Sequence, residues 1–215
     1  MVKEIDLAVT NHFSVEVLCF DFEGWSKKQN EQIINKYSTV NFILIDAGSN
    51  DIIEWIQSSL VEKASRLLSR FFTLSTKFCS YAVSKRSYLL TKQISKVQKP
   101  DWVIGHNPGA LYPTLIVKQK FNCNAGFDVE DYHPGESGNK KHQNLNIQLM
   151  GSILPKMDYV SFASPLIKLE SENNIKFNNH SKLITVNNFF SKNEFTLNEN
   201  SNITNEKIKL IWFSQ

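Results

Sequence analysis

The stretch PDWVIGHNPGALYPTLIVKQKFNCNAGFDVEDYHPGE, residues 100–136, decides the fold class. It contains an apolar strand pattern at 101–106, an Asn-Pro-Gly turn at 107–109, an apolar helical segment and a second strand pattern at 123–129. Asparagine is a good helix N-cap and proline suits the first helical turn, so we expect the turn to lead straight into the helix. A strand, a helix and a strand in this order predict a βαβ unit with parallel strands.

The same alternation extends over most of the chain. Six short runs rich in Val, Ile and Phe lie between longer polar segments, at 14–20, 40–45, 101–106, 123–129, 159–164 and 183–186. Residues 2–13 fit a short amphipathic helix, although part of this segment could also form a strand. Asp51 with Glu54 forms a capping-box pattern, and Ser164-Pro165 marks another helix start. We therefore predict an α/β protein, a Rossmann-like three-layer α/β/α domain with a mostly parallel sheet of about six strands.

The composition is that of a globular protein and excludes several classes. Of 215 residues, 41% are hydrophobic and 21% are charged, which excludes wholesale disorder. No uncharged apolar run reaches the roughly 18 residues that a membrane span needs. The three cysteines have no C-x-x-C spacing, so we expect reduced thiols rather than a disulfide scaffold or a cysteine zinc site. No glycine-rich nucleotide motif occurs, so nicotinamide and ATP cofactors have no support.

Positive charge is concentrated in residues 60–99, which hold nine Lys or Arg side chains and one acid, Glu62. This segment carries a net charge of +8, which leaves −5 for the rest of a chain whose total is +3. Aromatic side chains are interleaved with the cations, a composition that suits an anionic membrane surface or nucleic-acid phosphates. No recognised motif supports the second, so we expect no nucleic-acid partner. The segment could also be an ordinary amphipathic helix with its aromatics in the core and its lysines in water.

The first candidate functional site lies at a strand end. In a parallel sheet, ligands bind at the carboxyl edges of the strands. His106 ends one strand, and the helix start after it, at Asn107 and Gly109, would offer backbone N–H groups to a phosphate or sugar oxygen. The plainer interpretation is that His106 caps the strand edge and Gly109 serves packing.

The second candidate is an acidic cluster that ends the next strand, within FDVEDYHPGES (127–137). Its members could bind a divalent metal, orient sugar hydroxyls or act as acid and base: Asp128, Glu130, Asp131, His133 and Glu136. Strand alternation would turn Asp128 and Glu130 to the same face. No defined ligand spacing supports a metal, so none is expected, and a solvated acidic loop is the alternative.

Residues 100–136 resemble the central part of the N-terminal domain of retaining GT-B glycosyltransferases of the family-4 type. In that two-domain family, a strand ending in His enters a helix and the next strand ends in an acidic turn. Three further segments are similar to the family's next strand and helix, to the strand before its interdomain linker and to the first strand of its C-terminal domain: 157–170, 182–190 and 207–215. Residues 2–21 look like its first helix and second strand.

The resemblance implies a metal-independent enzyme that moves a sugar from a nucleotide-sugar donor to a glycan or lipid-linked acceptor, as in polysaccharide synthesis for a bacterial cell envelope. His106 would be the catalytic residue, beside the donor sugar, and no cofactor is needed besides the nucleotide-sugar substrate. The residues expected to bind substrate are Asn107, Gly109, Asp128, Glu130, Asp131 and His133. The protein would be cytoplasmic, with peripheral contact to the inner face of the membrane through Lys63, Arg66, Arg70, Lys77, Lys85 and Arg86.

The expected organisation is a Rossmann-like domain over 1–190, a polar linker over 191–206, and the first strand of a C-terminal donor-binding domain over 207–215. The family's first strand has no counterpart ahead of Val2, and its second domain has none beyond Gln215. We therefore expect little activity from the isolated chain and self-association through exposed interdomain surface. Two alternatives stay open: a non-catalytic module that binds a membrane or partner through residues 60–99, and a sugar-nucleotide epimerase of the same architecture.

Overall fold

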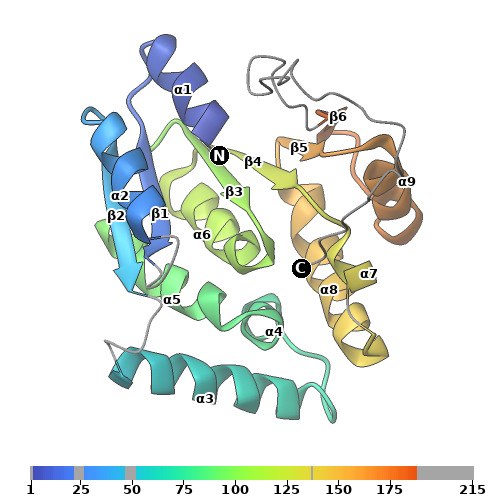
Figure 1. Cartoon of the computed structure of the whole chain (residues 1–215). Coiled ribbons are helices and arrows are strands. Elements are labelled where there is room, and N and C mark those ends of the chain that lie inside the picture. Colours follow the sequence, from blue (N-terminus) through green and yellow to red (C-terminus); the bar gives the residue numbers. More distant parts are fainter. Residues whose placement is uncertain (1, 22–26, 47–51, 137, 188–215) are drawn as a thin grey trace, which may run out of the picture.

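Strands and helices alternate along the chain in the computed structural model, which describes residues 2–21, 27–46, 52–136 and 138–187 (Figure 1). The strands are β1 (Glu16–Asp21), β2 (Asn41–Asp46), β3 (Trp102–His106), β4 (Asn124–Val129), β5 (Tyr159–Phe162) and β6 (Lys182–Thr185). The helices are α1 (Val2–Thr10), α2 (Lys27–Lys36), α3 (Ile52–Leu68), α4 (Thr76–Val83), α5 (Lys85–Gln93), α6 (Leu111–Phe121), α7 (His133–Glu136), α8 (Lys140–Ile153) and α9 (Pro165–Asn174). Three short 3-10 turns are η1 (Ile94–Lys96), η2 (Pro108–Ala110) and η3 (Leu154–Lys156).

The six strands are all parallel, but they divide into two sheets. β1 pairs with β2, while β3, β4, β5 and β6 form a four-stranded sheet in that order. Parallel neighbours need crossover connections, which the intervening helices provide. The predicted α/β class and parallel pairing are confirmed, and each predicted strand forms within two residues of its expected start. The structure differs from the prediction in one respect. The six strands form two sheets rather than one, because β1 and β3 pair neither with each other nor with a described strand between them.

The main core lies between the four-stranded sheet and helices α4, α6 and α8. Alternate residues of β4 and β5 enter it, and their largest buried side chains are Phe127 and Phe162, which are 1% and 0% exposed. Helix α8 faces them with Leu149, Met150 and Ile153. The α8 spacing follows the helical period, so one stripe of the helix is buried while its other side meets water.

The two-stranded sheet has a much smaller core. Ile5 from α1 packs with Tyr37 and Val40, which lie between α2 and β2. A second small cluster joins β2 to α5 through Ile45, Leu89 and Leu90. The helical prediction for residues 2–13 is confirmed over Val2–Thr10, and the strand alternative is wrong, because Ile5 is the buried residue on one side of an amphipathic helix.

A slot separates β1 from β3. Glu16 at the start of β1 accepts a hydrogen bond from the backbone N–H of Gln98, just before β3, so the amino ends of the two strands meet. At the other ends, Phe20 and Ala110 pack against the same small cluster on α5. Between these contacts lies a cavity of about 1850 Å³, lined by both strands and by α1. The edges of β1 and β3 that face each other pair with no described strand. The cavity therefore lies where the hydrogen bonds of a continuous sheet would run.

Helix α3 is the outermost helix of its side of the molecule and packs on α4 and α5 (Figure 1). Its buried residues are Ser58 and Ser65, not its large apolar side chains. Those apolar side chains are exposed, from Ile52 and Ile53 at its start to Leu67 and Leu68 at its end. The alternative interpretation of residues 60–99, an ordinary amphipathic helix that faces the core, is therefore wrong for the part that lies in α3. It holds for α4, where Tyr81 is buried and Lys77 is exposed.

The remaining local predictions have mixed outcomes. Ser164 caps α9, since its hydroxyl accepts a hydrogen bond from the backbone N–H of Ile167, and Pro165 fills the first turn as expected. The Asp51 cap, the 191–206 linker and the 207–215 strand lie outside the described residues. The three cysteines are free thiols, as predicted.

Candidate functional site

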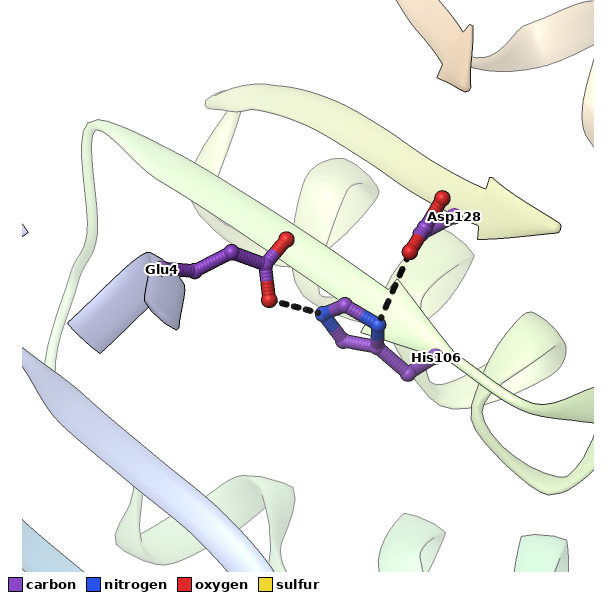
Figure 2. Close-up of side chains that lie close together, drawn as sticks. All are labelled: Glu4, His106 and Asp128. Carbon is purple, nitrogen blue, oxygen red and sulfur yellow. Dashed lines mark ion pairs between the residues drawn. The ribbon is translucent and has the colours of Figure 1, made fainter. Parts of the chain in front are cut away.

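His106 occupies the carboxyl end of β3, directly opposite Asp128 in the register with β4. Figure 2 shows Glu4, from α1, and Asp128 pointing toward the two ring nitrogens of His106. The Nε2 atom lies 3.2 Å from the Glu4 carboxylate. The Nδ1 atom lies 3.6 Å from Asp128 and 3.6 Å from Glu130. The structure thus brings together His106 and two of the acids predicted at the next strand end, and adds a third.

These contacts decide the charge of the imidazole. Burial alone would lower the pKa of His106, but the contacts with Asp128 and Glu4 outweigh it and raise that pKa to about 9. The hydrogen bond to His106 in turn lowers the pKa of the Glu4 carboxyl to about 2, although burial opposes this. At neutral pH the ring is therefore an imidazolium with a proton on both nitrogens, and it cannot serve as a general base without losing one. Nε2 is within hydrogen-bond distance of Glu4, whereas the buried Nδ1 has no hydrogen-bond partner among the described residues.

Asp128 is held in place by a residue that the sequence patterns did not suggest. The hydroxyl of Ser161, on β5, donates a hydrogen bond of 2.8 Å to the Asp128 carboxylate. Ser161 is only 7% exposed and lies opposite Asp128 in the β4–β5 register. The position of Asp128 is therefore fixed from β5, and Ser161 could be found only after the register of the two strands was known.

Tyr159 is a further residue of the site. Its ring lies on Gly126, where any side chain would overlap it, and contacts Trp102 with ring centroids 5.9 Å apart. Burial raises the pKa of the Tyr159 hydroxyl to about 12, with the charges of Glu4 and Asp128 adding to the effect. The phenol therefore stays protonated and can donate a hydrogen bond beside the carboxylates.

The turn after His106 differs from the prediction. Asn107 is followed by the 3-10 turn η2, and α6 begins only at Leu111, so Asn107 does not cap an α-helix and makes no side-chain cap bond. Its backbone has φ 66° and ψ 152°, a conformation that non-glycine residues rarely adopt. Gly109 is buried, and a Cβ atom there would lie 3.2 Å from Arg86 and 3.3 Å from Ser84. Close packing against the α4–α5 junction thus accounts for this glycine.

The rest of the acidic cluster lies apart from His106. His133 is buried in α7 and its Nδ1 atom lies 3.2 Å from Glu136, not near the imidazole of His106. Asp131 is exposed, and its backbone carbonyl accepts a hydrogen bond from the N–H of His133. The cluster therefore divides: Asp128 and Glu130 belong with His106, whereas His133 and Glu136 line another part of the same cavity.

The donor set Glu4, His106 and Asp128 is compact enough to surround a cation, with ligand atoms all within 4.8 Å of one another. A metal-binding imidazole must be neutral, however. The contacts with the facing carboxylates keep this ring protonated on both nitrogens at neutral pH. In the structure, the positive charge of the imidazolium balances the negative charge of the carboxylates. Binding a divalent ion there would require that proton to leave.

The six cations expected at a membrane are in part engaged within the molecule. Arg66 donates to the backbone carbonyl of Ala82 and to Glu62. Lys85 lies over the ring of Trp55, and Arg86 lies over that of Phe20, near the slot. Lys63 on α3 and Arg70 just after it are exposed, as is Lys77 on α4, which lies over the ring of Phe78. None of the described helices is both long and apolar enough to cross a bilayer.

No family model matches the sequence, and no curated protein is significantly similar to it.

Proposed function

We propose that this chain is the acceptor-side domain of a glycosyltransferase that moves a sugar from a nucleotide-sugar to a glycan or lipid-linked acceptor. The observation that carries the proposal is the position of His106. It lies at the carboxyl edge of a parallel sheet, flanked by Asp128 and Glu130, and it lines a large cavity. This edge is where α/β sheets bind their ligands.

The chemistry of the cluster suits a substrate with many hydroxyl groups. Carboxylates accept hydrogen bonds from sugar hydroxyls, and a charged imidazole donates to them or to a phosphate oxygen. In such a transfer the His106 imidazolium supplies positive charge to the departing diphosphate, while Asp128 and Glu130 orient the acceptor. Glu4 covers Nε2 of His106, so a substrate oxygen that uses this nitrogen displaces the Glu4 carboxylate.

Sugar transfer by the full-length protein tests the proposal. His106→Ala should lower turnover about 10²-fold or more, the usual cost of removing a preorganised electrostatic donor. His180→Ala, at an exposed position, is the matched control and should leave turnover unchanged. Unchanged sugar transfer by His106→Ala would show that His106 is not part of the site. Conversion of a nucleotide-sugar without any acceptor indicates the epimerase alternative instead.

A further inference from the structure

The outward side of α3 is an apolar stripe with helical spacing. Ile53, Ile56, Leu60 and Leu67 follow one another at intervals of three, four and seven residues, and Phe71 lies in the turn just after the helix. All five are exposed, between 45% and 73%. Ile52, Trp55, Leu68 and Phe72 flank the stripe and are also 45% exposed or more. Together these nine side chains form a surface that we call the α3 apolar face. A patch this continuous on a globular protein marks a contact surface.

The opposite side of α3 explains why the apolar residues point outward. Ser58 and Ser65, seven residues apart, are 0% and 2% exposed and lie against α4 and α5. Small hydroxyl residues let these helices approach closely, and the Ser58 hydroxyl donates to the carbonyl of Trp55. The orientation is fixed further by Arg66, which ties α3 to the end of α4 through the carbonyl of Ala82. The helix is thus held in this orientation by its polar side.

Among the described residues, the net charge around the α3 apolar face is positive. The two acids of α3 are half-buried and paired, Glu54 with Lys92 at 2.6 Å and Glu62 with Arg66 at 2.9 Å. Lys63 lies in the stripe between Leu60 and Leu67, and Arg70 follows it. Lys77 and the exposed ring of Phe78 extend the same composition beyond the helix. A second copy of this face would therefore bring like charges together, whereas anionic lipid headgroups complement it.

We propose that the α3 apolar face docks the protein on an anionic bilayer, with α3 lying along the surface. The apolar and aromatic side chains enter the boundary between headgroups and acyl chains, and Lys63 and Arg70 extend their charged ends to the phosphates. This inference stands on α3 and its surroundings and does not depend on the chemistry at His106.

Co-sedimentation of the full chain with lipid vesicles tests it. The chain should bind vesicles that contain phosphatidylglycerol, and should bind pure phosphatidylcholine vesicles far more weakly. Added salt should weaken the binding, because it screens the headgroup attraction. Equal binding to both vesicle types, or none to either, overturns the proposal.

Two pairs of variants separate the apolar and the charged contributions. Phe71→Asp with Phe72→Asp should weaken binding at least about 100-fold, because two inserted rings are lost. Leu166→Asp on α9 is the control, since Leu166 is 65% exposed outside the face. Lys63→Glu with Arg70→Glu should weaken binding about 30-fold, against no change for Lys140→Glu with Lys176→Glu.

The far-UV circular dichroism of every variant should match that of the wild type, since all the substituted side chains are exposed. If the Phe71 and Phe72 substitutions leave vesicle binding intact, the α3 apolar face does not bind a membrane. The same conclusion follows if these substitutions abolish self-association of the chain instead of lipid binding.

Discussion

The two sheets of this protein are held together in different ways. The four-stranded sheet shares one continuous core with α4, α6 and α8, in which Phe127, Leu149 and Phe162 have almost no contact with water. The two-stranded sheet relies on a few residues around Ile5, on the small cluster on α5, and on contacts such as Glu4 with His106. The comparison teaches that the candidate site is assembled from a well-packed part and a weakly packed one. His106 and Asp128 belong to the first, and Glu4 belongs to the second.

The largest expected effect is in the main core. Leu149→Ala removes a fully buried side chain of α8, and it should lower the free energy of unfolding by about 3 kcal/mol. Leu169→Ala, at a 53% exposed position on α9, should change it by about 0.5 kcal/mol or less. Urea unfolding of both variants measures the difference. A loss at position 149 no greater than at position 169 contradicts the assignment of α8 to the core.

A smaller and more local effect is expected in the two-stranded sheet. Ile5→Ala should cost about 2 kcal/mol, at the low end for such a change, because a thin cluster can relax around the missing atoms. Hydrogen exchange should show lost amide protection in β1 and β2 with little change in β4 and β5. Leu7→Ala, on the exposed side of the same helix, is the control. Equal loss of protection in both sheets would show that they unfold as one unit.

The smallest effect concerns the ion pair that links the two parts. The folded pKa of Glu4 is lowered to about 2, so its contribution is present above its ordinary value of 4.5 and is lost as the pH falls toward 2. The folded pKa of His106 is raised to about 9, so its contribution is complete below 6.5 and is lost as the pH rises through 9. The pair therefore stabilises the protein most between pH 4.5 and 6.5.

Replacing Glu4 by Gln tests this window. The variant should be less stable than the wild type by about 1 kcal/mol at pH 6, since Glu4 is nearly half exposed and solvent screens the pair. The difference should vanish above pH 9. The NMR titration of the His106 ring should also move to a lower pKa in the variant, whereas Glu172→Gln at an exposed position should leave it unchanged. An unshifted titration would falsify the contact with Glu4.

The sequence predicted much of the fold because its strands are short, apolar and well separated. Their parallel order followed from the helices between them, and Ser164 with Pro165 marked one helix start correctly. The orientation of α3 could not be predicted, because burial of Ser58 and Ser65 depends on how closely α4 and α5 approach. Periodicity indicates that a helix has two sides, and packing decides which one faces inward.

The candidate site was predictable only where one strand end determined it. His106 and Asp128 both end strands of one βαβ unit, so their proximity follows from parallel pairing. Glu4 lies about a hundred positions earlier in the chain, and no local pattern connects it with His106. Gly109 and Asn107 were expected to form a helix start, but the tight contact with Arg86 and the intervening 3-10 turn gave them a different setting.

The slot between β1 and β3 gives the protein a built-in chemical reporter. Cys19 lines this slot, and burial, followed by the charge of Asp21, raises the pKa of its thiol. Cys79 lies in the main core, where burial raises its pKa to about 11 and keeps it from alkylating reagents. The modification rate of Cys19 therefore measures how open the gap between the sheets is, and any segment or ligand that enters this gap will slow the reaction.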